Sequence, residues 1–153
     1  MLAAVLRATL PAALALTLAA CSSGGGGGLS PGLAARMDLP RAQLDRAEAI
    51  SIVNAFRAQS GASALTEDSG LDATAQALAS QYAKTGKQPP KPAGAMQIRY
   101  SAGYFTFAET FSGWRNSPQD APALTDRSAS KAGVAAVYDA GSPYGVYWVI
   151  VLG

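Results

Sequence analysis

Apolar residues recur every three or four positions in the first half of the chain, which is the spacing of amphipathic helices. One helix is expected to end at Ser60-Gly61, and a second is expected from about Leu71 to Lys84. Asp68 or Ser69 is a suitable N-cap for the second helix, and Gly86 follows its C-terminal end. The apolar positions are Ala49, Ile52, Val53 and Phe56 in the first helix and Leu71, Ala75, Leu78, Ala79 and Tyr82 in the second.

A third helix is indicated by Thr106-Phe107-Ala108-Glu109, which has the pattern of a capping box. Ser117-Pro118 ends this helix. Aromatic residues at helical spacing ordinarily pack in a core, and Val149 and Val151 are the expected partners; an apolar ligand groove is the alternative. The aromatic residues on its face are Phe107, Phe111 and Trp114.

The periodicity changes near the C-terminus. Residues 132–138 and 145–152 are rich in Val, Tyr, Ile and Trp, and turn-forming residues separate them. This pattern predicts a β-hairpin whose second strand is apolar enough to be central in a sheet. Earlier in the chain, residues 87–92 hold three prolines and cannot be helical, and residues 119–130 are polar with room for one helical turn. Helices followed by a hairpin predict an α+β domain with an antiparallel sheet.

The first 20 residues have the layout of an export signal. Arg7 provides a basic start, and the apolar run from Leu10 to Ala20 is too short to span a bilayer. The run ends in Leu18-Ala19-Ala20-Cys21, which matches the lipobox of bacterial lipoproteins. We therefore expect cleavage before Cys21 and attachment of a diacylglyceryl group to its thiol; an ordinary secretory signal is the alternative.

The predicted organisation is a signal peptide at 1–20, a lipidated and flexible linker at 21–40, and one domain at 41–153. The linker contains five consecutive glycines, which favour a random coil. Ser22 is not the Asp that retains some lipoproteins in the inner membrane. The expected location is the cell envelope, at the periplasmic face of the outer membrane in a cell that has one.

The composition restricts the chemistry that this chain can perform. It contains no His, and its single Cys is the predicted lipidation residue Cys21. The commonest general base and metal ligand is therefore absent, and no thiol remains for catalysis. The net charge of +2 becomes +1 without residues 1–20, which contain one Arg and no acid, so the charge gives no reason to expect nucleic acid binding.

Three stretches in order resemble the CAP superfamily, also called SCP-like, which includes cysteine-rich secretory, antigen-five and pathogenesis-related proteins. Ile52–Gly61, followed by Leu65-Thr66, is similar to the family's Asn-x-x-Arg helix and the loop after it. Phe111–Pro118 resembles its Trp helix with a Ser-Pro ending. Gly133–Tyr138 and Tyr147-Trp148-Val149 resemble its terminal hairpin. The resemblance implies an α/β/α sandwich.

The resemblance also implies a cavity lined by two His and two Glu, which binds a divalent metal in some members. This chain keeps only Glu109 at a matching position. The short segment after Gly86 lacks the first His, Gln97-Ile98-Arg99 stands in place of Gly-Glu-Asn, and Asp120 stands in place of the second His. We therefore expect neither a metal nor another cofactor.

The two carboxylates at positions that match the family's site, Glu109 and Asp120, each have a structural and a chemical interpretation. Glu109 is expected to complete the capping box, and a remnant cavity acid is the alternative. Asp120 is expected to be a loop carboxylate or a cap, and an acid/base partner of Glu109 is the alternative. Ser112 has neither the sequence of a nucleophile elbow nor a His base.

The leading hypothesis is an envelope-anchored, non-catalytic CAP-like domain that binds a small apolar ligand or a protein partner, or serves as a spacer. The resemblance implies these ligand classes, and the sequence does not fix the oligomeric state. The alternative is a hydrolase of cell-wall or secreted material, which requires a second carboxylate about 5–10 Å from Glu109 across a cleft. Tyrosines beside glycines and loops are further candidates for binding: Tyr100, Tyr104, Tyr144 and Tyr147.

Overall fold

The computed structural model describes residues 29–153. The predicted signal peptide, Cys21 and the glycine tract lie outside the described residues. The elements, in chain order, are α1 (Pro31–Ala34), α2 (Arg46–Gln59), β1 (Thr66–Glu67), α3 (Ser69–Thr85), β2 (Gln97–Ala102), α4 (Phe107–Asn116), α5 (Ala121–Leu124), β3 (Lys131–Tyr138) and β4 (Val146–Leu152).

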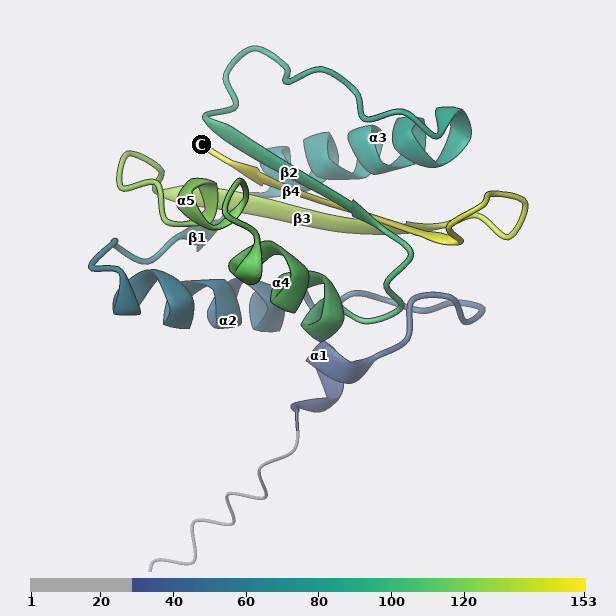
Figure 1. Ribbon diagram of the computed structural model, residues 1–153, viewed down its shortest axis with the longest axis horizontal. Helices are drawn as coiled ribbons and strands as arrows, with labels where there is room; N and C mark the ends of the chain where they lie inside the picture. Colours follow the sequence, from purple (N-terminus) through teal and green to yellow (C-terminus); the bar gives the residue numbers. More distant parts are fainter. Residues whose placement is uncertain (1–28) are drawn as a thin grey trace, which may run out of the picture.

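The strands form one sheet in the order β1-β3-β4-β2, with helices on both faces (Figure 1). Helix α3 covers one face, and α2 and α4 cover the other. The predicted α+β class and the α/β/α arrangement are confirmed. The sheet is mixed, because the two-residue strand β1 pairs in parallel with β3 at one edge, whereas β4 pairs antiparallel with both β3 and β2.

Strand β4 is central, and all seven of its residues are buried. Because side chains alternate along a strand, Val149 and Val151 face α3. The prediction that they contact the aromatic residues of α4 was therefore wrong. Phe107 instead packs on Trp148, with ring centroids 5.8 Å apart. The β4 residues on the α4 side are Val146, Trp148, Ile150 and Leu152.

Local signals fix the ends of the long helices. Asp68 caps α3 by accepting hydrogen bonds from the Gly70 and Leu71 N–H groups at 2.9 and 3.0 Å. Gly86 ends α3 in the left-handed region, with φ 66°. Its N–H donates to the Tyr82 carbonyl at 2.8 Å. Both predicted ends of α3 are confirmed, because capping is decided by residues adjacent in sequence.

Gly133 allows α3 to pack closely against the sheet. A Cβ atom at this position would lie 2.1 Å from the Leu71 carbonyl carbon and 2.2 Å from the Asp72 nitrogen. These are backbone atoms, which cannot move aside as a flexible side chain would. The contact between α3 and β3 therefore requires glycine at this position.

The packed part of the chain begins before residue 41, where the domain boundary was predicted. Leu33 in α1 and Met37 are 8% and 5% exposed, and both belong to the core between the sheet and α2 and α4. The Met37 N–H also donates to the Phe105 carbonyl at 2.9 Å. Residues 31–37, which the sequence pattern assigns to the linker, are held by apolar burial that their irregular pattern does not reveal.

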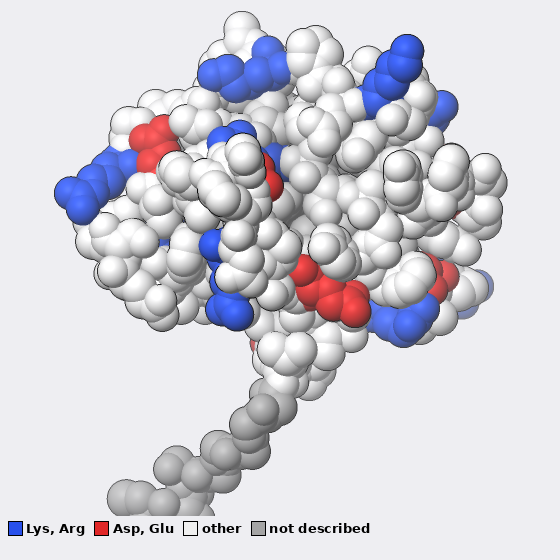
Figure 2. Space-filling view, viewed as in Figure 1, with Lys and Arg blue, Asp and Glu red and all other residues white. Residues whose placement is uncertain are grey.

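Charged side chains are interspersed on the surface shown in Figure 2, where neither sign forms a continuous face. Among residues 29–153, no helix is both long and apolar enough to cross a membrane.

Candidate functional site

Glu109 is the residue that the family resemblance places in a cavity, and its carboxylate is engaged at the start of α4. Oε2 accepts hydrogen bonds from the Phe105 N–H at 3.1 Å and from the Thr106 N–H and hydroxyl at 3.0 Å each. The Thr106 oxygen in turn accepts from the Glu109 N–H at 3.2 Å. The predicted capping box is therefore confirmed. One of the two Glu109 carboxylate oxygens is thereby taken up by the start of α4.

The surface beside Glu109 is hollowed on both sides of α4. On the side of α2, a hollow of about 310 Å³ is mainly apolar and is lined by Ile52, Ala108 and Phe111, with Leu29 and Arg115 at its wall. On the other side, a shallow hollow of about 390 Å³ is lined by Tyr104, Ser112, Gly113 and Asn116. Glu109 and Ser112 border both hollows, and neither hollow has a second carboxylate among its lining residues.

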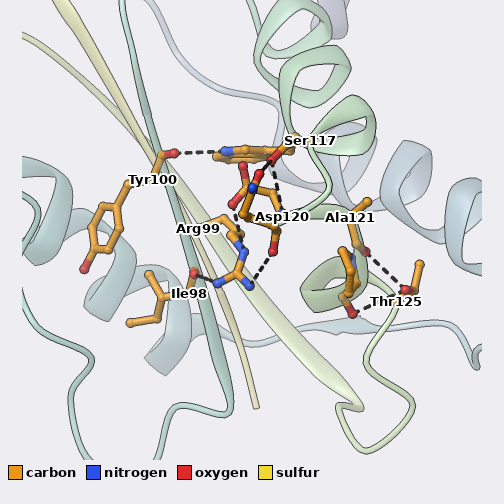
Figure 3. Close-up of polar contacts among 10 residues, drawn as sticks. Ile98, Arg99, Tyr100, Ser117, Asp120, Ala121 and Thr125 are labelled. Atoms are coloured by element: carbon orange, nitrogen blue, oxygen red, sulfur yellow. Dashed lines mark hydrogen bonds and ion pairs between the residues drawn. The ribbon is translucent and has the colours of Figure 1, made fainter.

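Asp120, the second predicted site residue, lies beyond the other end of α4 and pairs with Arg99 of β2. The Arg99 Nε lies 3.0 Å from Asp120 Oδ1 in an ion pair (Figure 3). Nε is buried. Its angle to Asp120 is not that of a hydrogen bond, so the contact with Asp120 is an ion pair alone. The same guanidinium donates to the Gln119 carbonyl at 3.1 Å and to the Ile98 carbonyl. Two residues at positions where the chain departs from the family pattern thus neutralise each other.

The structure therefore separates the two predicted site residues. Glu109 is in the first turn of α4, and Asp120 precedes α5. Asp120 lines neither of the hollows beside Glu109. The Arg99 partner of Asp120 was not predicted, because the two residues are far apart in sequence and only the fold brings them together. Among the described residues, no group of three His, Cys, Asp or Glu side chains is placed to hold a metal ion.

The aromatic residues of α4 belong to the core, and of the three only Phe111 also lines the hollow on the side of α2. Phe107, Phe111 and Trp114 are 1–3% exposed. The Trp114 indole N–H donates to the Tyr100 carbonyl at 3.0 Å (Figure 3). Tyr100 lies in β2, which is an edge strand of the sheet. Of the four tyrosines named as candidates for binding, Tyr104 and Tyr144 are exposed and Tyr147 is fully buried. The hydroxyl of the fourth, Tyr100, donates to the Pro89 carbonyl at 3.0 Å.

The Asn-x-x-Arg segment that carried much of the resemblance has a structural role. The Asn54 amide donates to the Leu65 carbonyl at 2.9 Å and accepts from the Leu65 N–H at 2.7 Å. Arg57 is fully buried, and its guanidinium donates to four backbone carbonyls at 2.7–3.1 Å. Burial lowers the pKa of Arg57. Its charge is retained in proteins, so the carbonyl dipoles replace its hydration.

These carbonyls belong to the loop after α2, to the last residue of α5 and to the segment that joins α5 to β3. The guanidinium therefore connects three parts of the chain through a single side chain. The acceptors of Arg57 are Ser63, Leu124, Asp126 and Ala129. The resemblance alone marked this segment in the sequence, and its role in joining the loops was not predicted.

Comparisons with solved structures show where else this fold occurs. An outer surface protein of Borrelia burgdorferi is 15% identical with a TM-score of 0.56, over 67% of this chain and 87% of that one. An extracellular SCP-domain protein of Bacillus anthracis is also 15% identical with a TM-score of 0.57, over 70% of this chain and 39% of that one. A cysteine-rich secretory protein of Staphylococcus aureus is 16% identical with a TM-score of 0.51, over 74% of this chain and 41% of that one.

At these identities the similarity shows a shared fold. A sequence comparison with curated proteins gave no match. The family model described as "CAP: Cysteine-rich secretory protein family" matches residues 50–152, which is most of the described chain. With the fold and this match in agreement, the chain belongs to the CAP (cysteine-rich secretory protein) family.

Proposed function

We propose that this chain is a lipid-anchored envelope protein whose CAP domain binds a small apolar ligand in the hollow between α2 and α4, without catalysing a reaction. The observation that carries the proposal is the surface beside Glu109. Its carboxylate is held by three hydrogen bonds at the start of α4, while the adjacent hollow offers Ile52 and Phe111. Ligand sites are mostly apolar, with few polar groups at their edges, and their volumes begin at about 300 Å³.

The rim of this hollow supplies one cation. The Arg115 guanidinium carbon lies 5.8 Å from the centre of the Phe111 ring. A ligand with an apolar chain and a carboxylate head would place the chain on Ile52 and the head beside Arg115. This combination favours a fatty acid over a neutral hydrocarbon, because Arg forms charge-assisted hydrogen bonds with carboxylates.

The position of the hollow supports the predicted anchor. Leu29, which is 61% exposed, lies on its wall and directly follows the glycine tract. Only seven residues separate Cys21 from Leu29 in the sequence, so a lipid on Cys21 would keep the hollow close to the bilayer. Similar structures include proteins described as outer surface or extracellular, which favours the same side of the membrane for this chain.

The hydrolase alternative has less support. Carboxylate-only glycoside hydrolysis needs two carboxyl groups about 5–10 Å apart across a cleft. Neither hollow beside Glu109 contains a second carboxylate, and Asp120 is paired with Arg99. We therefore propose a binding role over a catalytic one.

Ligand binding can be tested with a photoreactive fatty acid and the full chain in its membrane. We expect cross-linked peptides from α2 and α4, which peptide mapping distinguishes from any lipid on Cys21. Ile52→Glu places a charge in the hollow and should abolish this cross-link. Met96→Glu is the control, because Met96 is an exposed apolar residue that lines none of the hollows, whereas Ile52 is half-buried. Equal labelling of both variants would contradict the proposal.

The anchor has a separate test. Cys21→Ser removes the thiol that would carry the lipid, so we expect the protein to move from the membrane to the soluble fraction of cells. Persistent membrane association of this variant would contradict the lipid anchor, and it would leave the ligand proposal to be decided by cross-linking.

A further inference from the structure

A second hollow, of about 580 Å³, lies between the segment that follows α1, helix α3 and the end of β3. It is larger than the hollows beside Glu109 and shares no lining residue with them. The segment that forms much of its wall passes close to the hairpin end of the sheet (Figure 1). The hollow is therefore a separate candidate site.

The charge of this hollow has one sign. Arg41 and Arg46 line it together with Gln43, Gln76 and the phenol-bearing Tyr138, and no carboxylate is among the lining residues. The Arg46 Nε donates to the Val134 carbonyl at 3.0 Å. Within residues 29–153, its two terminal nitrogens and the Arg41 guanidinium form no hydrogen bond to the protein. The Arg41 guanidinium and the two terminal nitrogens of Arg46 are thus left to bind an anion, whereas the Arg46 Nε is already paired.

Two carboxylates near Arg46, those of Asp45 and Asp72, do not line the hollow. Asp45 accepts from the Glu48 N–H at 2.9 Å as the cap of α2. Asp72 accepts from the Val134 N–H at 2.9 Å, and its Oδ1 lies 3.5 Å from the Arg46 Nε. Asp72 therefore balances the charge of Arg46 at Nε from outside the hollow, and no carboxylate lies among the lining residues beside the terminal nitrogens of Arg46 and the Arg41 guanidinium.

Arg41 occupies a backbone position that favours glycine. The Ala42 N–H donates to the Leu39 carbonyl at 3.1 Å and closes a four-residue turn. Pro40 is the second residue of this turn and Arg41 is the third. Arg41 has φ 63° and is the one non-glycine residue with positive φ in the described chain. A proline at the second position and a positive φ at the third are the features of a type II turn, in which glycine is preferred at the third position. A side chain kept in this region is a strain that functional sites often retain.

We infer that this hollow binds a small organic anion, with a phosphate or carboxylate group between Arg41 and Arg46. Arginine binds such groups through paired N–H donors, and Gln43, Gln76 and the Tyr138 hydroxyl provide further donors. Leu39 on the wall can contact an apolar part of the ligand. The volume is within the range of about 300–1,000 Å³ found for small-molecule sites. In an envelope protein the anion could be a free phosphate compound or a phospholipid headgroup.

The test is calorimetric titration of the full chain in neutral detergent with inorganic phosphate and with short-chain phosphatidic acid. We expect one-to-one saturable binding of at least one probe. Arg41→Gly should weaken it about tenfold or more, because a charge-assisted pair is lost. The unfolding midpoint of this variant should not fall, because glycine tolerates the positive φ. Arg127→Gly is the control, since Arg127 is exposed and lies outside the hollow.

The two probes distinguish the sources of the anion. Saturation by inorganic phosphate alone would support a free phosphate compound, and much tighter binding of phosphatidic acid would support a lipid headgroup, provided that Arg41→Gly weakens either one. The inference is overturned if neither probe saturates, or if Arg41→Gly binds as tightly as the unaltered chain.

Discussion

Arg57→Ala should strongly destabilise the domain. The Arg57 guanidinium is fully buried and donates to four carbonyls, and the bonds to Leu124 and Ala129, at 2.7 and 3.1 Å, are themselves buried. The bonds to Ser63 and Asp126, at 2.8 and 3.0 Å, are only part-buried. Water can replace the guanidinium at the part-buried carbonyls more readily than at the buried ones.

The expected loss in the free energy of unfolding follows from the two buried acceptors. Each buried group left without a partner costs about 1–3 kcal/mol, and removal of the large side chain leaves a cavity. Relief of the buried charge offsets part of this loss. We therefore expect about 3–5 kcal/mol in total, or a fall of more than about 10 °C in the unfolding midpoint of a domain of this size.

Thermal and urea unfolding of the full chain, followed by near-ultraviolet circular dichroism, would measure this loss. Arg57→Lys keeps the charge but not the planar fork of donors, so its loss should be large but smaller than that of alanine. Arg127→Ala is the matched control: it removes one exposed hydrogen bond to the Ser60 carbonyl and should change stability by less than about 1 kcal/mol. If Arg57→Ala were as stable as this control, the proposed role of Arg57 would be wrong.

Three further predictions concern local features. Glu109→Ala should lower stability by about 1 kcal/mol in thermal unfolding, whereas Glu109→Gln should preserve most of the capping box; equal losses would argue against capping. Gly133→Ala should cost about 3 kcal/mol or more or prevent folding, because its Cβ would lie 2.1 Å from the Leu71 carbonyl carbon; a normal unfolding midpoint would contradict this packing. Hydrogen bonds from Ser128 and Gln97 lower the pKa of Asp126 to about 2 from its ordinary 3.8, so its stabilising contribution is present above that ordinary value and is lost as the pH falls towards 2. Asp126→Asn should flatten the pH dependence of the unfolding midpoint in this interval, and an unchanged slope would refute the assignment.

Features that depend on neighbours in sequence could be predicted. The cap at Asp68, the end at Gly86 and the capping box at Glu109 each require only a few consecutive residues, and all three are confirmed. The C-terminal hairpin also follows from two runs rich in Val, Tyr, Ile and Trp with turn-forming residues between them, and β3 and β4 pair as expected.

Features that depend on tertiary partners could not be predicted in the same way. Strand β2 has alternating Ile98 and Tyr100, but this signal is short and follows a proline-rich segment, and β4 is needed to pair with it. The burial of Met37 likewise requires the completed core. The pair of Arg99 and Asp120 arises only when β2 and the end of α4 come together.

The central proposal is that Glu109 and Asp120, the two predicted site carboxylates, serve the fold and do not perform chemistry. Calorimetric titration of Zn²⁺ into the full chain tests it most directly. Because Glu109 caps α4 and Asp120 pairs with Arg99, we predict no binding tighter than about 1 mM. One-to-one binding in the micromolar range that is weakened by both Glu109→Gln and Asp120→Asn would contradict the account.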